Sequence, residues 1–197
     1  MTTAMRWRII VLQVIAILVL AGASAAAFYA NNFTSTEIRN QLAPQQIYFP
    51  QNAKQGLPAN LSAYAGQQVV NGDQAHAYAE NYIGLHLKEI GQGHPYSYWS
   101  GQARAATDPK VAAQDQAIAD TMFKGDTLRT MLNTAWTFSV IGQIAFYAGI
   151  GLVVAALLVL AALGFEVYEL VTRKEVAQVV RTTHAGSELQ PGIPAGV

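Results

Sequence analysis

The chain has 197 residues, in which twelve acidic side chains balance twelve basic ones, and it contains no cysteine. Balanced charge gives the molecule no net attraction for nucleic acid or other polyanions. Without cysteine there is no disulfide, thiolate metal site or cysteine nucleophile. The informative feature is the hydropathy pattern, which places two long apolar blocks on either side of a more polar middle part.

The first apolar block follows a short basic start. Arg6 and Arg8 precede a run from Ile9 to Tyr29, so we interpret residues 1–8 as a cytoplasmic N-terminus and residues 9–30 as a transmembrane helix. A secretory signal peptide is the alternative, because small residues at the end of the run suit cleavage. The run of about 20 residues is longer than the roughly 7–15 of a signal peptide's apolar centre, which favours an uncleaved anchor.

The middle part, residues 31–136, is expected to form a small, mainly helical extracytoplasmic domain. Spacing of apolar residues, Gly and Pro predicts a short helix over 38–42 before Pro44, an extended segment over 46–50, and helices over 74–90, 97–106 and 110–123. The tripeptide at 124–126, which contains Gly125, is expected to break or bend the chain.

The second apolar block runs from Phe138 to Phe165 and contains no proline. About 20 apolar residues are enough to cross the hydrocarbon core of a bilayer, so residues 137–170 are interpreted as a second transmembrane helix with an inner extension. This span is expected to be continuous with a long helix that begins at Asp126. The predicted fold class is therefore an all-α membrane protein with two spans flanking a helical domain.

The positive charges near the span ends predict the orientation. Arg6 and Arg8 precede the first span, and Arg173, Lys174 and Arg181 follow the second, so both termini are expected on the cytoplasmic side of the plasma (inner) membrane. Residues 171–197 would form a cytoplasmic tail. Its Gly- and Pro-rich end, from Ala185, is expected to be disordered.

Both predicted spans carry small residues at four-residue spacing. Such pairs allow helices to approach closely in lipid and mark candidate packing faces, although alanine and glycine are also simply common in membrane helices. The candidates are Gly22, Ala26, Ala145, Gly149, Gly151 and Ala155.

The histidines give weak signals. His76 and Glu80 have a spacing that can hold a metal, and Asp73 lies within a turn of His76 on the other side. One histidine and two acids on a polar helix face, without a second histidine, favour a solvated surface, and we assign no metal or cofactor. His86 falls on the apolar face of the same helix, where a core histidine bonded to a carbonyl is the favoured interpretation.

An aromatic cluster, Tyr96, Tyr98 and Trp99, lies beside His94. Packing against the helix 74–90 is the favoured interpretation. The alternative is a ligand or interface site in which these rings and His86 line an apolar pocket near the membrane, since amphipathic rings favour that depth.

The run from Tyr64 to Glu80, the segment 86–90 and the segment 123–129 resemble a set of uncharacterised two-span membrane proteins of actinobacteria. The resemblance implies an external domain between two spans and carries no activity or functional residue.

The sequence contains no nucleophile, phosphate-loop or metalloprotease motif. We therefore expect a non-enzymatic membrane protein that self-associates, or is an accessory or scaffold subunit of a larger envelope or respiratory complex. The alternatives are a module that binds membrane lipids or small ligands, and a multimeric channel.

Overall fold

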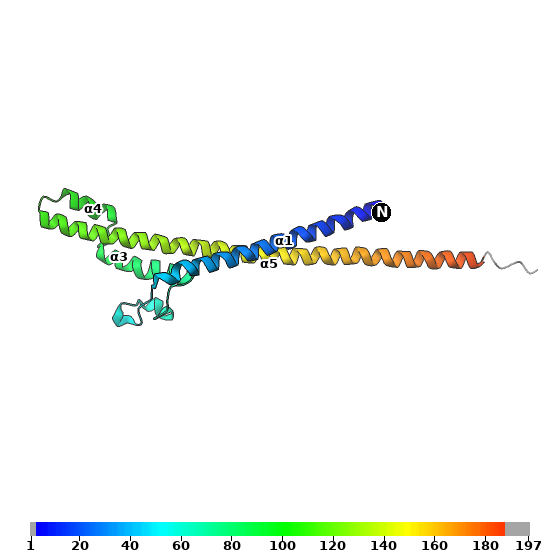
Figure 1. The fold of residues 1–197 in the computed structure, drawn as a ribbon, viewed down its shortest axis with the longest axis horizontal. Coiled ribbons are helices and arrows are strands. Elements are labelled where there is room, and N and C mark those ends of the chain that lie inside the picture. Colours follow the sequence, from blue (N-terminus) through cyan, green and yellow to red (C-terminus); the bar gives the residue numbers. More distant parts are fainter. Residues whose placement is uncertain (1–2, 188–197) are drawn as a thin grey trace, which may run out of the picture. The chain divides into compact units, whose positions relative to one another are not determined.

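The computed structural model describes the backbone of residues 3–187 and the side chains of residues 5–172, and the described residues are helical without a strand (Figure 1). The chain divides into two compact units. One comprises residues 27–147 and is called the head below. The other, called the stem, comprises the residues before 27 and after 147.

Helix α1 (Thr3–Leu42) is one uninterrupted helix of 40 residues. It therefore includes both the predicted span and the predicted short helix over 38–42, which is not separate. Thr34, just before the predicted short helix, donates its hydroxyl to the carbonyls of Ala30 and Asn31 in the preceding turn. A threonine bonded in this way sits inside a helix without breaking it. The helix stops before a 3₁₀ turn, η1 (Ala43–Gln45), which contains Pro44.

Helix α5 (Pro109–Ser187) is also continuous, over 79 residues. Its start matches the predicted one, because the Asp108 carboxylate accepts from the Lys110 amide at 2.8 Å. The predicted continuity between the second span and a long helix is confirmed, but the predicted break at 124–126 is wrong. The helix includes Ala185 to Ser187, which were expected to be disordered; the tail from residue 188 lies outside the described residues.

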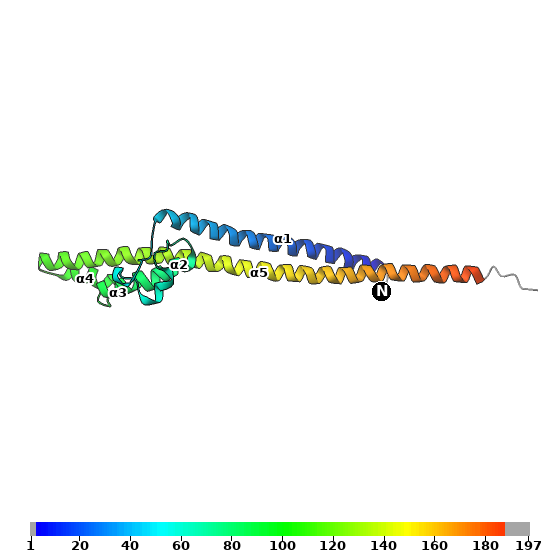
Figure 2. The same cartoon turned by 90° about the horizontal axis from the view of Figure 1, so that it is seen from below.

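The predicted helix over 74–90 is present in three consecutive parts. They are α2 (Gly72–Tyr78), a π-helical segment η4 (Ala79–Ile83) and α3 (Gly84–Ile90). The Asn71 side chain caps the start by accepting from the Gln74 amide at 2.9 Å. Helix α4 (Tyr96–Ala105) follows, close to its predicted range. In both views α3 and α4 lie beside the first part of α5 (Figures 1 and 2).

The segment between α1 and α2 contains two further 3₁₀ turns, η2 (Ala53–Gln55) and η3 (Ala59–Tyr64). The segment predicted to be extended forms only an isolated bridge between Tyr48 and Gln68, flanked by hydrogen bonds from the Phe49 and Val69 amides. This loop contributes apolar side chains to one core shared with α1, α2 and α5. Its most completely buried members are Phe49, Leu61, Val69 and Leu132.

In the stem, α1 and α5 run antiparallel. The Ser24 hydroxyl donates to the Gly149 carbonyl at 3.1 Å, and Arg6 lies 3.6 Å from Glu169. Large apolar side chains such as Leu18 and Leu158 remain exposed on both helices. Two helices of the described residues are thus long and apolar enough to cross a membrane.

Candidate functional site

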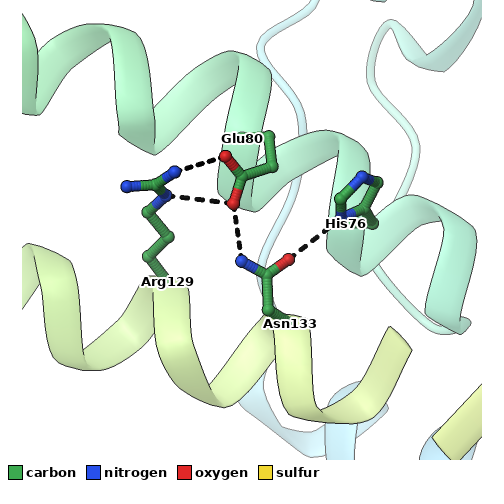
Figure 3. A network of polar contacts seen from close by, with 4 residues as sticks. All are labelled: His76, Glu80, Arg129 and Asn133. Carbon is green, nitrogen blue, oxygen red and sulfur yellow. Dashed lines mark hydrogen bonds and ion pairs between the residues drawn. The ribbon is translucent and has the colours of Figure 1, made fainter. Parts of the chain in front are cut away.

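A network of polar side chains joins the π-helical segment to α5 (Figure 3). The Glu80 carboxylate accepts from Asn133 Nδ2 at 2.6 Å, from Arg129 Nε at 3.1 Å and from the second guanidinium nitrogen of Arg129. Asn133 Oδ1 lies 3.0 Å from His76 Nδ1. Because the Asn133 amide nitrogen is used on Glu80, its oxygen acts as an acceptor, so His76 Nδ1 carries the proton.

The charges of this network stabilise one another. Hydrogen bonding to the Arg129 guanidinium lowers the pKa of the Glu80 carboxyl, and Glu80 raises the pKa of Arg129 in return. The His76 ring stacks on Trp136 with centroids 4.1 Å apart. The prediction that His76 and Glu80 lie on a solvated face is therefore wrong, because α5 covers that face.

The network links α2 and the π-helical segment to α5 and is called the clamp below. Its carboxylate oxygens and its amide all have partners within the chain, and neither of the two hollows described below is lined by any of its four residues. Among the described side chains there is also no group of three His, Cys, Asp or Glu residues that could hold a metal ion. The clamp positions α5 in the head.

The four residues predicted as a possible ligand or interface site do not line one common site in the structure. His86 Nδ1 lies 2.8 Å from the Tyr82 carbonyl, which confirms the predicted pairing with a carbonyl. Trp99 is buried and donates its indole N–H to the Gly91 carbonyl at 2.9 Å, which confirms the packing interpretation for that ring. Tyr96 and Tyr98 remain exposed, and Tyr98 stacks on His94.

An apolar groove of about 510 Å³ lies elsewhere in the head, between the last turns of α1 and the middle of α5. Helix α1 contributes Phe33, Ile38 and Leu42 to its apolar lining. Helix α5 contributes Leu128, Met131, Leu132, Ala135 and Phe138. The polar residues at its edge are uncharged except for Glu37. A concave, mainly apolar site of this size suits a small apolar ligand.

A shallower hollow of about 360 Å³ adjoins this groove along α5 and shares Met131 with it. Tyr96 and Phe123 form its apolar walls. Phe123, Met131 and Phe138 are 59%, 65% and 53% exposed and follow one another at intervals of eight and seven residues. They therefore form an exposed apolar stripe on one side of α5.

The sequence did not indicate the groove as a site. Its residues come from segments almost 100 positions apart, and each is ordinary in its own helix. The one local signal is the heptad-like spacing of large apolar residues on α5, which we did not single out. Tyr96 reaches the adjoining hollow, whereas His86, Tyr98 and Trp99 line neither of the two.

The predicted small-residue faces point in different directions. Ala145 and Gly149 lie on the side of α5 that is covered within the chain, where Gly149 is buried and bonded to Ser24. Ala155 is half-buried, whereas Ala26 is exposed. Gly22 and Gly151 are exposed, and a side chain added at either would meet nothing within 4 Å.

One close approach between the two long helices was not foreseen. A Cβ atom on Gly142 would lie 2.3 Å from Thr34 Oγ1, so this glycine of the second predicted span allows α5 to pack closely against α1 just beyond the end of the first predicted span. Gly142 has no small neighbour at four-residue spacing and therefore did not match the pattern that marked the other glycines.

Comparison of the chain with protein-family models, curated proteins and solved structures found no match. The resemblance to actinobacterial two-span proteins stays an expectation from the sequence. The functional argument therefore rests on the residues of this chain.

Proposed function

We propose that this chain is a non-enzymatic integral membrane protein that self-associates through its two spans and presents its head outside the membrane as a scaffold. Both termini would lie in the cytoplasm, as the positive charges at the span ends favour. The observation that carries the proposal is the open surface over Gly22 on α1 and over Gly151 on α5, each on the side of its helix turned away from the Ser24–Gly149 contact.

These two glycines lie at the same level of the stem. The Ser24 hydroxyl bonds to the Gly149 carbonyl. Gly22 lies two residues before Ser24, and Gly151 lies two residues after Gly149. Because the helices are antiparallel, both glycines lie on the same side of that bond along the length of the stem. Both have empty space over their Cα atoms. In lipid, where apolar burial gives no driving force, helices associate where small residues allow their backbones to approach. A second copy is the partner that presents a surface of the same kind.

The proposal is tested by the mass of the particle in native nanodiscs. We expect the wild type to give a multiple of the 21.2 kDa chain. The double variant Gly22→Leu/Gly151→Leu places a bulky side chain on each of the two open surfaces and should give a single copy. A wild-type particle of one copy would contradict the proposal.

Gly164→Leu is the matched control. Gly164 also has nothing within 4 Å and lies on the same helix, but 13 residues from Gly151, which turns it about 140° away around the helix axis. It should leave the copy number unchanged. Unrelated chains in a fixed ratio would favour the accessory-subunit alternative instead.

A further inference from the structure

We infer that the groove between α1 and α5 in the head is a binding site for one acyl chain of a membrane lipid, drawn from the leaflet next to the head. The inference rests on the membrane location in the proposed function and is independent of self-association.

The position of the groove supports a lipid chain. Phe33 lies three residues after the end of the first predicted span, and Phe138 is the second residue of the other. Both line the groove, and both are more than half exposed. Phe138 therefore carries the apolar surface of the second predicted span directly into the groove, and only Asn31 and Asn32 separate Phe33 from the first. A chain from the adjacent leaflet can enter along Phe138.

The length of the groove also fits. From Phe138 to Leu128 along α5 is ten residues, or about 15 Å at the helical rise. Half of a hydrocarbon core of about 30 Å is the same length, and it is the space that one acyl chain occupies in its leaflet. A chain that turns from the bilayer into the groove would place its methyl end near Leu128 and Leu42.

The chemistry of the lining does not suit an anionic occupant. The groove wall is mainly aliphatic and aromatic, its polar residues are Thr34, Glu37, Gln41, Gln45 and Thr134, and no basic residue lines it. Glu37, its one acid, is already hydrogen-bonded to Gln41. The lining therefore has no group to neutralise a phosphate, so the headgroup would remain at the membrane surface and the site would select the chain.

The test uses full-length protein in vesicles of phosphatidylcholine that carries a photoreactive diazirine on the last carbon of one acyl chain. After illumination, labelled peptides are mapped by mass spectrometry. We expect label within residues 128–135 and 38–42, in addition to label on the spans. Lipid chains that stay in the bilayer place their ends near its middle, so label confined to the spans would overturn the inference.

Two variants and one control separate the groove from general lipid contact. Met131→Glu puts a carboxylate against the chain, and Ala135→Phe fills the groove; each should lower head labelling by about tenfold while span labelling stays constant. Phe123→Glu changes an equally exposed residue of α5 that does not line the groove, and it should have no effect. Undiminished head labelling in both groove variants would contradict the site.

Because particle mass reports self-association and labelled peptides report the groove, either idea can fail alone. Cross-linking of the groove to a second copy in place of lipid would overturn the lipid assignment and leave the self-association proposal intact.

Discussion

Gly125 of α5 lies so close to Leu87 of α3 that a Cβ atom on the glycine would be 2.4 Å from Leu87 Cδ2. Leu87 is buried in the core of the head and has little room to move. The glycine that suggested a break in the helix therefore serves close packing between two helices within an unbroken one.

Gly125→Ala should destabilise the head. Overpacking costs about 1–3 kcal/mol, and the better helix propensity of alanine returns up to about 1 kcal/mol, so we expect a net loss of about 1–2 kcal/mol. Thermal or denaturant unfolding measures it. Gly101→Ala in α4 is the control. A Cβ atom added at Gly101 would meet nothing within 4 Å, so the change should be neutral or slightly stabilising.

Replacing Glu80 with Gln should remove an acid-sensitive contribution to stability. The folded-state pKa of Glu80 lies below the usual value of 4.5, so the contribution is fully present above that pH and is lost as pH falls through the lower folded pKa. Because the pair is partly exposed, we expect less than about 1 kcal/mol. Unfolding midpoints between neutral and acid pH should fall less steeply in the variant; equal slopes would contradict the assignment.

Tyr78 should make the head sensitive to alkali. Burial, and then the charge of Tyr82, raises the pKa of Tyr78 from 10.0 to about 12. The neutral phenol is therefore favoured in the folded state, and its contribution is present below pH 10 and lost as pH rises toward 12. Tyr78→Phe should flatten this alkaline loss in unfolding midpoints. Tyr98→Phe, which alters an exposed ring, should leave the loss unchanged.

Gln13→Leu should stabilise the stem. Gln13 Oε1 is buried and has no hydrogen-bond partner among the side chains and backbone that the structure describes. An unsatisfied buried amide costs about 1–3 kcal/mol, so an apolar side chain of similar size should raise the melting temperature in detergent. Gln13 lies nine residues, or about half a helical circumference, from Gly22, so copy number should not change. Lower stability would mean that the amide has a partner in the assembled protein.

Local patterns predicted most of the helices of this protein. The helices over 74–90 and 110–123 were predicted from the spacing of apolar residues and of Gly and Pro, which act within a few turns; the Asn71 cap of α2 was seen only in the structure. The two apolar blocks followed from length and composition alone. Such features need no knowledge of what packs against them.

The errors came from long-range packing. Gly125 was taken for a break because its neighbour Leu87 is 38 positions away, and His76 and Glu80 were placed on a solvated face because α5 covers them only in the folded head. The π-helical turn around Glu80 and the groove beside Met131 likewise lie where segments far apart in the chain meet. A single sequence gives no information about these neighbours.

The shared core of the head has a consequence for synthesis. Phe49 and Leu61 are buried together with Met122 and Leu132, and a Cβ on Gly72 would collide with Ser139, which lies beyond them in the chain. The head therefore cannot complete its core until α5 has been synthesised as far as the first residues of the second apolar block. Until then residues 43–106 lack the helix against which their apolar side chains pack, so the head must fold late, after most of the chain has been made.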